Sequence, residues 1–424
     1  MIEALYALYL KHPQISIDTR SISKHCIFFA LKGDNFNANE FAHTALSNGA
    51  AYAIVDEEKF VLDERCILVD NVLETLQELA RHHRRRIKCP VLAITGSNGK
   101  TTSKELIYRV LQQKYTTTAT KGNYNNHIGV PLTILSVDTQ TEFAIIEMGA
   151  NHIGEIDFLC NIAMPEHGVI TNVGKAHLEG FGSLEGVLEA KTELYRYIDK
   201  RNGVLFIKDN QNNLLEKRAE PTKFFTYGSL EKSSYKIRFI EAQPKVVVSY
   251  EDKHINSQLI GDYNFDNIAL SIAIGLHFKV DKEDIKKALE LYVPTNNRSQ
   301  IVNTASNTIL LDAYNANPMS VEKAIQTLSS IEHENKMIIL GDMFELGQES
   351  KKEHMRIINL CLSHGFSNVM LVGEEFSTVN KTSYISYRTT KELFENLNVV
   401  QIKDAFILIK GSRSMKLEQL VKKL

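Results

Sequence analysis

Apolar runs separated by helix-length amphipathic stretches predict alternating strands and helices along most of the chain. Residues 91–95, VLAIT, form one such run, and an amphipathic stretch with a helical period begins at about Lys100. The runs EFAIIEMGA (142–150) and HGVITNVG (167–174) are almost continuously apolar, as expected of parallel strands that are buried on both faces. The pattern therefore predicts an α/β region built on a parallel sheet.

The N-terminal part of the chain predicts a smaller α/β unit. The runs CIFFALKG (26–33) and AAYAIVD (50–56) are strand-like, and residues 41–48 between them are helical in pattern. We place the end of this unit at residue 87, just before the apolar run at residues 91–95.

The same alternation continues to the C-terminus in two further parts. A β-rich patch at 203–251 is followed by a helical pattern in NFDNIALSIAIGLHF (264–278). After residue 297, four strand-like runs are separated by segments of helix length, which predicts a doubly wound α/β domain. These four runs are TILLDAY (308–314), KMIILGDM (336–343), NVMLVGE (368–374) and AFILIKGS (405–412).

Polar residues or glycines follow the carboxyl end of most of these runs. In open parallel sheets, ligands bind beyond the carboxyl ends of the strands. The two larger regions are therefore expected to form two crevices that face one another across a ligand. The residues at these strand ends are Thr95, Gly96, Glu147, Asn172, Asp312, Asp342 and Lys410.

Composition narrows the class of protein. The 424 residues predict about two to four domains, and a formal net charge of −2 gives no global field that would recruit nucleic acid or a membrane. The five cysteines are scattered and form no CxxC pair, which favours reduced thiols over disulfides or a zinc site. No apolar run approaches the roughly 18 residues that span a bilayer, and the N-terminal apolar stretch is too short and too interrupted by polar residues for a signal peptide.

The basic run RHHRRRIKCP (81–90) is interpreted as a solvated helix end or linker, with phosphate contact as the alternative.

The stretch TGSNGKTT (95–102) is a candidate phosphate-binding loop between a strand and a helix. Glycines allow backbone amides to point at phosphate oxygens, a lysine adds positive charge, and a threonine hydroxyl can bind Mg²⁺. The usual pattern has four residues between the glycines, whereas this loop has two. The alternative is a glycine turn with a chance lysine. The candidate nucleotide-binding residues are Gly96, Ser97, Asn98, Gly99, Lys100, Thr101 and Thr102.

Five residues outside the loop are candidates for chemistry, and each has a simpler alternative. Glu147 ends a strand and can hold a magnesium ion or be a surface glutamate. His177 can be a metal ligand or a loop histidine, and by spacing alone Lys191 is a surface lysine paired with a neighbouring glutamate. Arg298 lies at the entry to the last domain, and Asp312 can bind ribose hydroxyls or cap a turn.

Four stretches of the sequence together resemble the Mur ligase family, which builds peptidoglycan precursors. They are TGSNGKTT, IEMG, GKAHLEGFGS and EAKTEL, and the resemblance extends from about Ile15 to Leu417. The shortened loop is typical of that family. DAYNANPMS (312–320), LGDMFELG (340–347) and KGSRSMKLE (410–418) resemble the member that joins D-alanyl-D-alanine to UDP-N-acetylmuramoyl-tripeptide. The Asp-Asn-Pro-Arg motif expected of the preceding ligase in the pathway is absent from the sequence.

The resemblance implies the cofactors and the catalytic residues. Lys100 and the loop amides bind the ATP phosphates, Thr101 and Glu147 hold one Mg²⁺, and His177 holds a second. Lys191 matches a lysine that is carbamylated in the family, where the carbamate helps to hold the second metal. On this basis Lys100, His177, Lys191 and Arg298 are the expected catalytic residues.

The resemblance also implies further ATP and substrate contacts. Asn267 is expected to contact adenine, Arg298 a phosphate and Asp312 the ribose. Asp18, Thr19 and Arg20 are expected at the UDP end of the substrate, and Asn125 and Asn126 near its muramoyl peptide or the γ-phosphate. Two stretches depart from the family pattern: Tyr263 replaces a histidine, and the loop GDNFNANEF (33–41) lacks Asp-Gly-His.

The resemblance therefore implies an α/β protein of three domains. These are a UDP-sugar-binding domain (1–87), a central ATP-binding domain with a P-loop ATPase-like parallel sheet (88–297) and a C-terminal Rossmann-like doubly wound domain (298–424). The expected protein is a monomeric amide ligase of the bacterial cytoplasm that uses ATP through an acyl phosphate and binds neither nucleic acid nor membrane. Folylpolyglutamate synthase, a non-catalytic nucleotide-binding protein, and a P-loop motor or GTPase are the alternatives.

Overall fold

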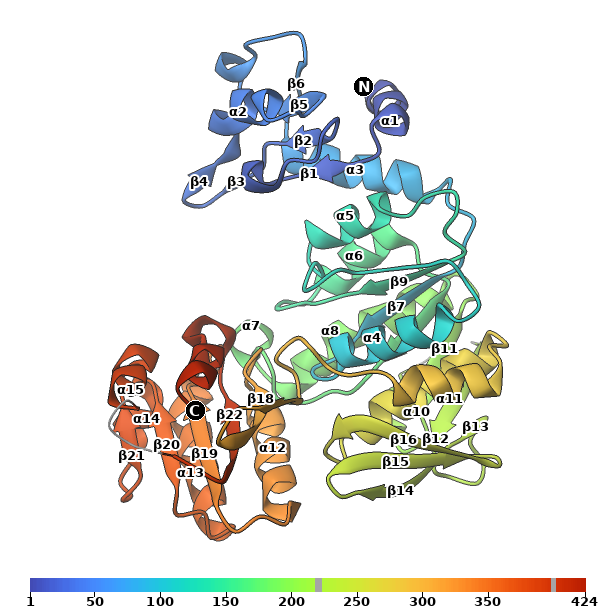
Figure 1. Ribbon diagram of the computed structural model, residues 1–424. Coiled ribbons are helices and arrows are strands. Elements are labelled where there is room, and N and C mark those ends of the chain that lie inside the picture. The colour runs from blue at the N-terminus through green and yellow to red at the C-terminus, as the bar shows by residue number, and fades with distance from the viewer. Residues whose placement is uncertain (218–222, 398–401) are drawn as a thin grey trace.

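Three α/β units make up the structure, a computed structural model that describes residues 1–217, 223–397 and 402–424. Figure 1 shows the N-terminal unit at the top, the central unit at the lower right and the C-terminal unit at the lower left. None of the helices in these described ranges has the length and apolar character needed to cross a bilayer. The domain boundaries at 87/88 and 297/298 stay predictions.

The N-terminal unit is a four-stranded parallel sheet covered on both faces. Alternate residues of one strand point to opposite faces, so Phe28 packs against α2 while Ile27 and Phe29 pack against α1 and α3. The run at 26–33 splits into β2 and one strand of a small hairpin, β3 and β4. In spatial order the sheet contains β1 (Ile15–Ser16), β2 (Ile27–Phe29), β5 (Tyr52–Val55) and β6 (Cys66–Leu68); the other elements are α1 (Ile2–Lys11), β3 (Lys32–Gly33), β4 (Phe36–Asn37), α2 (Ala42–Ser47) and α3 (Val72–Arg84).

A seven-stranded parallel sheet forms the centre of the molecule, as the continuously apolar runs predict. Helices α4 and α10 cover one face, and α5, α6 and α8 cover the other. Its strands, in spatial order, are β13 (Tyr235–Lys236), β12 (Lys223–Gly228), β11 (Val204–Lys208), β10 (His167–Ile170), β7 (Val91–Thr95), β9 (Phe143–Glu147) and β8 (Thr117–Ala119). Its helices are α4 (Lys100–Leu111), α5 (Gly129–Leu135), α6 (Glu155–Ala163), α7 (Leu178–Phe181), α8 (Leu184–Asp199), α9 (Asn212–Leu215), α10 (Asn264–His277) and α11 (Lys282–Glu290).

A three-stranded antiparallel sheet packs outside α10 and α11. Its inward-facing residues, such as Val246 and Val248, alternate with exposed or half-exposed ones. The strands are β14 (Arg238–Ala242), β15 (Lys245–Tyr250) and β16 (Lys253–Ile260). This sheet is the β-rich patch that the sequence indicates.

The C-terminal unit is a six-stranded sheet in which only the edge strand β17 is antiparallel. Helices α12, α13 and α14 cover one face, and α15 with the C-terminal turns covers the other. The prediction of a doubly wound sheet is confirmed. The strands, in spatial order, are β17 (Gln300–Asn303), β18 (Asn307–Asp312), β22 (Ala405–Lys410), β19 (Lys336–Gly341), β20 (Val369–Val372) and β21 (Ile385–Tyr387), and the helices are α12 (Pro318–Ser330), α13 (Ser350–Ser363), α14 (Glu374–Val379) and α15 (Thr390–Asn396).

The basic run at 81–90 is only in part the solvated helix end or linker that its charge indicates, since Arg85, Arg86 and Lys88 are exposed and follow the end of α3. Helix α3 includes Arg84, and the side chains of His82, His83 and Arg84 are buried. Arg84 Nε donates to the carbonyl of Ala163 at 2.6 Å, and Nη2 donates to that of Met164 at 2.8 Å. These carbonyls end α6 and lack partners within the helix, so the arginine joins the N-terminal unit to the central one.

Candidate functional site

A cavity of about 610 Å³ lies where strand ends of the central and C-terminal sheets meet. The phosphate loop and the end of β9 line one side, and residues between 298 and 323 line the other. The expected pair of facing crevices is therefore present. Asp342 does not belong to it: its buried carboxylate accepts the backbone N–H groups of Glu375 and Phe376 and thereby caps α14.

The backbone of the phosphate loop is held against the end of β10. Asn172 accepts Ser97 N–H at its carbonyl (2.9 Å) and Asn98 N–H at its side-chain oxygen (3.0 Å). Gly96 has φ +142°, and a Cβ there would lie 2.0 Å from Thr171 Oγ1. The close approach of two strand ends is thus the reason that this position requires glycine.

Lys100 lies at the start of α4, folded back over the loop. Its ammonium donates to the carbonyls of Gly96 (2.5 Å) and Ser97 (3.3 Å). Burial lowers the pKa of Lys100 to about 8, with Glu147 opposing this shift and Arg298 adding to it. A strongly desolvated cation at a helix N-terminus is suited to an anionic ligand.

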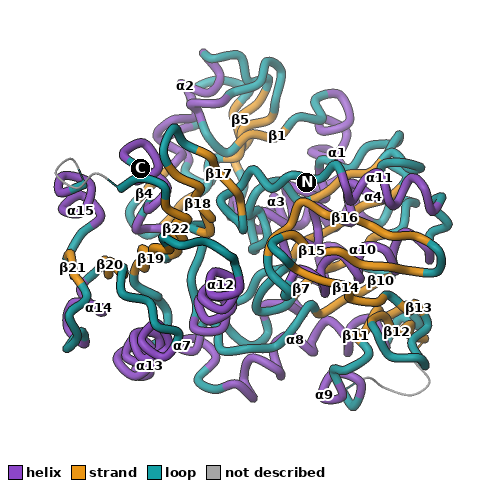
Figure 2. The backbone as a smooth tube through the Cα atoms, turned by 60° about the horizontal axis from the view of Figure 1, so that its bottom comes forward, coloured by secondary structure: helices purple, strands orange, loops and turns teal. Residues whose placement is uncertain are grey.

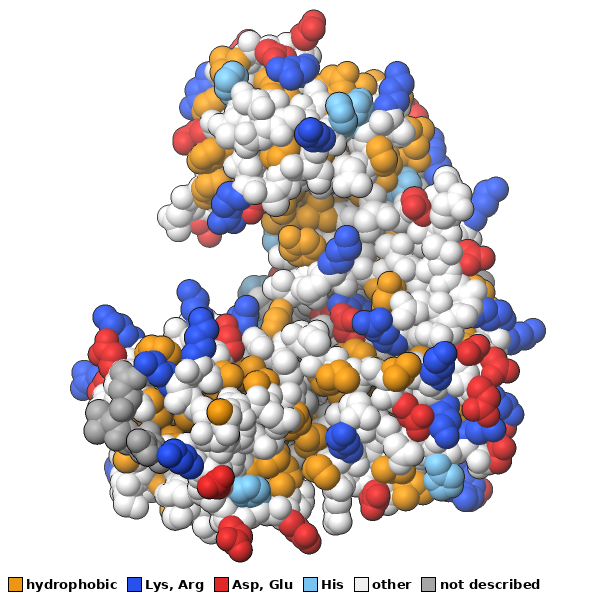
Figure 3. Space-filling model, in the orientation of Figure 1, with side chains coloured by type: hydrophobic (Ala, Val, Ile, Leu, Met, Phe, Trp, Pro, Cys, Tyr) orange, Lys and Arg blue, Asp and Glu red, His pale blue; other side chains and the backbone are white. Residues whose placement is uncertain are grey.

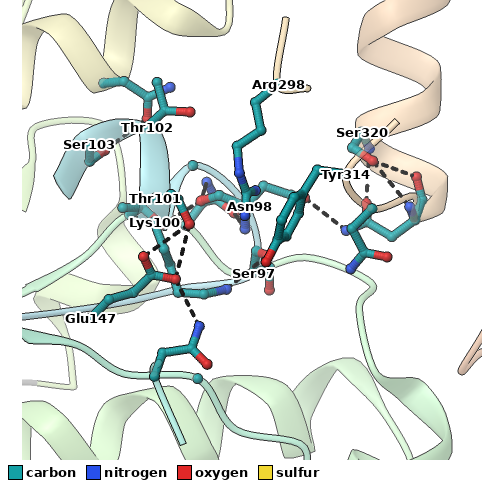
Figure 4. Close-up of a pocket in the computed structure, with 18 of the residues that line it drawn as sticks. Ser97, Asn98, Lys100, Thr101, Thr102, Ser103, Glu147, Arg298, Tyr314 and Ser320 are labelled. Atoms are coloured by element: carbon teal, nitrogen blue, oxygen red, sulfur yellow. Dashed lines mark hydrogen bonds between the residues drawn. The ribbon is translucent and has the colours of Figure 1, made fainter. Parts of the chain in front are cut away.

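Thr101 and Glu147 form a ready oxygen-donor pair beside this lysine (Figure 4). Thr101 Oγ1 donates to the two carboxylate oxygens of Glu147 at 2.9 and 3.1 Å, and Asn125 Nδ2 donates to one of them at 2.8 Å. Hydroxyl and carboxylate oxygens are ligands that Mg²⁺ accepts. Within the ranges that the structure describes, no three His, Cys, Asp or Glu side chains cluster to hold an ion by themselves, so an ion here would need ligand oxygens as well.

His177 and Lys191 occupy different environments. His177 lines the cavity, and its Nδ1 contacts the carboxylate of Glu345 from the C-terminal unit. Lys191 lies on α8 and is 1% exposed, with Nζ 3.4 Å from the Ala150 carbonyl and 5.1 Å from the centre of the Phe181 ring. The interpretation of Lys191 as a surface lysine is therefore wrong. Burial, followed by the charge of Lys100, lowers the pKa of Lys191 to about 7.

The C-terminal unit contributes a cation and an anion to the cavity. The Arg298 guanidinium lies 3.7 Å from the centre of the Tyr314 ring, as Figure 4 shows. The Asp312 carboxylate accepts Ser299 N–H at 3.2 Å and pairs with the buried Lys410. The bond from Ser299 N–H agrees with the alternative of Asp312 as a turn or cap residue. Asp312 also lines the cavity, so its carboxylate is accessible to a ligand.

Asn267 lies behind the phosphate loop. Its side-chain oxygen accepts Ser103 Oγ–H at 2.9 Å, and a Cβ on Gly99 would lie 2.6 Å from that oxygen. Asn267 and its neighbour Tyr263 both line the cavity. These side chains of α10 and its entry therefore form part of the cavity wall beside the phosphate loop.

Two contacts between the central and C-terminal units were not predicted from the sequence. Asn317, the N-cap of α12, donates from Nδ2 to Asn98 Oδ1 at 2.8 Å, and Lys175 pairs with the buried Glu353 at 2.8 Å. Asn317 lies within the motif DAYNANPMS, which marked the segment, but no local pattern indicated its partner. Figure 2 shows α12 lying between the C-terminal sheet and the central unit.

The predicted substrate residues separate into two groups. Asn125 and Asn126 line the cavity, and Asn126 Oδ1 also accepts Gly129 N–H at 2.9 Å. Asp18, Thr19 and Arg20 lie in the N-terminal unit and are not among the cavity-lining residues. Asp18 pairs with Arg20, whose side chain is 88% exposed. In Figure 3 a deep hollow separates the N-terminal unit from the C-terminal one.

The family models that match the chain are the Mur ligase middle domain, over residues 94–275, and the Mur ligase glutamate ligase domain, over residues 297–413. The chain is 35% identical to the UDP-N-acetylmuramoyl-tripeptide–D-alanyl-D-alanine ligase of Bacillus subtilis, over 97% of this chain and 92% of that protein.

Solved structures agree with this similarity. A crystal structure of MurF from Acinetobacter baumannii superposes with a TM-score of 0.85 at 30% identity and covers 97% of this chain and 93% of that one. MurF ligase from Thermotoga maritima in complex with ADP gives a TM-score of 0.84 at 26% identity, over 97% and 96% of the two chains.

Proposed function

The chain belongs to the Mur ligase family, and we propose that it joins D-alanyl-D-alanine to UDP-N-acetylmuramoyl-tripeptide at the expense of ATP. The observation that supports this function most strongly is similarity to tripeptide–D-alanyl-D-alanine ligases over 97% of the chain. The geometry adds a phosphate loop, an oxygen-donor pair and two cations around one cavity. ATP is the nucleotide, as the ADP complex of the Thermotoga maritima relative supports.

The reaction joins a carboxylate to an amine. The terminal carboxylate of the tripeptide attacks the γ-phosphate of ATP, and ADP leaves with the bond electrons, which yields an acyl phosphate. The amine of the dipeptide attacks that carbonyl, inorganic phosphate departs, and the amine loses a proton as the amide forms. Because a carboxylate and a triphosphate repel one another, Lys100 and Arg298 are assigned to neutralise the meeting anions.

The residues around the loop fit ATP with Mg²⁺. Lys100 and the loop amides would bind the phosphates, and Thr101 and Glu147 would hold one Mg²⁺. The ion supplies charge neutralisation at the transferring phosphoryl group. Asn267 is assigned to adenine and Asp312 to the ribose. His177 is assigned to a second Mg²⁺, which would require that its Nδ1 leave the Glu345 carboxylate or that its other ring nitrogen bind the ion.

Lys191 is suited to carbamylation. A neutral amine attacks CO₂ and loses a proton to give a carbamate, and burial keeps the pKa of Lys191 near 7, so that much of it is neutral at pH 7. The product is an anion in place of a cation. It would add oxygen donors beside the Lys100 site, and we assign it to the second Mg²⁺ together with His177.

The long substrate needs both the cavity and the N-terminal unit. Asp18, Thr19 and Arg20 are assigned to its UDP end, and Asn125 and Asn126 to the peptide end. The hollow in Figure 3 lies between the N-terminal unit and the rest of the molecule. Closure about hinges near residues 89–90 and 293–294 would bring the ends of the substrate site together. We propose that the protein works as a monomer, because one chain supplies all of these residues. We also propose that it works in the bacterial cytoplasm.

Activity is expected to rise from pH 7 to about 8.5. The dipeptide α-amino group titrates near ~8, and Lys191 has a pKa of about 7. Both groups react as neutral amines, so raising the pH increases both the nucleophile and the carbamate. The negative charge of bound ATP favours the protonated form of Lys100, so at saturating ATP this cation is retained over the same range. Initial rates at sub-saturating dipeptide and fixed bicarbonate measure this dependence. A flat profile across this range would contradict an unassisted amine.

Alanine at Gly96 is expected to weaken ADP binding at least about tenfold. The substitution combines a left-handed φ with a 2.0 Å approach to Thr171 Oγ1, and strain of about 1–3 kcal/mol is typical of such positions. Isothermal titration with MgADP measures the effect. Gly365 has φ +74° with open space around it, so Gly365→Ala controls for backbone strain alone and should leave ADP binding unchanged.

The function is tested by ADP release. The expected result is ADP formation with UDP-N-acetylmuramoyl-tripeptide that becomes sustained when D-alanyl-D-alanine is added, together with a product heavier by the dipeptide less one water. A folded sample that turns over ATP with folate and glutamate instead would replace this function by that of a folylpolyglutamate synthase.

A further inference from the structure

A second buried lysine lies on α4, one turn after Lys100. Lys104 is 1% exposed, and its ammonium donates to the Thr120 carbonyl at 2.6 Å. It also lies 3.5 Å from the Gly122 carbonyl and 3.9 Å from Glu147 Oε2. Burying an ammonium group is costly unless polar groups surround it, so this arrangement stabilises one position of the residues that it contacts.

Those residues begin the segment that leads from β8 to α5. Thr120 Oγ1 accepts Glu147 N–H at 3.0 Å, and Asn125, five residues further along, donates to the Glu147 carboxylate at 2.8 Å. Lys104 therefore holds the start of a segment whose far end contacts the same glutamate. The segment 120–126 contains three asparagines that line the cavity, Asn123 and the two assigned to the substrate, Asn125 and Asn126.

We propose that Lys104 is a positioning residue that ties the phosphate-loop helix to segment 120–126 and thereby orders the substrate-side asparagines. This role rests on the proposed function. Lys104 does not line the cavity, so it acts through the segment and not by contact with a ligand. Nucleotide binding depends on a different set of bonds: Asn172 and Thr171 hold the phosphate loop, and Thr101 contacts both carboxylate oxygens of Glu147 without Lys104.

Kinetic and binding measurements separate an effect of Lys104 on substrate binding from an effect on nucleotide binding. In Lys104→Met, the KM for UDP-N-acetylmuramoyl-tripeptide is expected to rise about tenfold or more through misplacement of the asparagines. The dissociation constant for MgADP, from calorimetry, is expected to change less than about threefold. Lys336→Met is the matched control, since Lys336 also donates to a carbonyl, that of Ser329 at 2.9 Å, in the C-terminal unit. Its kinetics should match the wild type, and Lys104→Arg should recover part of the lost substrate affinity.

Trypsin gives a readout that needs no activity. Lys121 is exposed and lies within the segment, so its peptide bond should be cut several-fold faster in Lys104→Met than in the wild type, with the site assigned by mass spectrometry. If Lys104→Met does not fold, Lys104→Gln retains a donor without the charge and carries the same two measurements.

The proposal is overturned if a folded Lys104 variant keeps both the wild-type KM and the wild-type rate of cleavage after Lys121. An equal loss of MgADP affinity would also overturn it, since that result would indicate general damage to α4. If the wild-type protein does not use the muramoyl substrate, the proposed function fails, and the proteolysis result still decides whether Lys104 anchors the segment.

Discussion

Replacing Lys100 with alanine is expected to lower kcat/KM for ATP at least ~10²–10³-fold. A preorganised charge of this kind typically contributes ~3–4 kcal/mol to the transition state. Lys100 is also desolvated, with a pKa lowered to about 8, so its interaction with phosphate oxygens is screened less than that of a surface lysine. A coupled assay for ADP release measures the loss.

The loss should come from the missing charge and not from unfolding. Lys200 is an exposed lysine at the end of α8, so Lys200→Ala serves as the control and should retain full activity. The thermal unfolding transition of Lys100→Ala should stay close to that of the wild type, because Lys100 is only half-buried and water can replace its hydrogen bonds to the Gly96 and Ser97 carbonyls. Near-normal turnover by a folded Lys100→Ala would refute the assigned role.

Replacing Lys191 with alanine is expected to lower activity at least ~10²-fold, and short carboxylates are expected to restore part of it. The side chain that is removed is fully enclosed, so its loss leaves a space beside Ala150 and Phe181. Acetate or propionate can place an anion in that space, where the carbamate would lie. Initial rates over a range of carboxylate concentrations measure the rescue.

Lys191→Gln fills the same space with a neutral side chain, so it separates the loss of the carbamate charge from the loss of packing. Lys191→Gln should be as inactive as Lys191→Ala, but it should not respond to added carboxylate, because the amide occupies the space. Absence of rescue at every concentration in Lys191→Ala, or equal rescue in both variants, would contradict the assignment of a carbamate.

Short-range patterns predicted most of the fold. Continuous apolar runs such as residues 142–150 indicated strands covered on both faces, and they form strands of a parallel sheet with helices on both sides. The strand–loop–helix geometry around residues 96–99 was also predictable, since Gly96 and Gly99 adopt positive φ angles between β7 and α4. These features depend on residues that are close together in the sequence, so they can be predicted without the tertiary structure.

The environments of the charged residues were not predictable in the same way. Arg84 and Lys191 look like solvated charges by spacing alone, yet both are buried. Asp342 looks like a site residue at a strand end, yet it caps α14. Periodicity reports which apolar residues face inward, whereas the burial of a charge depends on which distant carbonyl or amide meets it.

By itself, therefore, the sequence determined the alternating α/β architecture, the phosphate loop and the family resemblance. Only the tertiary structure decided that Lys104 holds segment 120–126, that Asn317 reaches Asn98, and that His177 contacts Glu345. The reason is physical: strands, helices and tight loops follow from interactions among near neighbours, whereas these contacts join residues far apart in the chain. They exist only once separate sheets have packed around a common cavity.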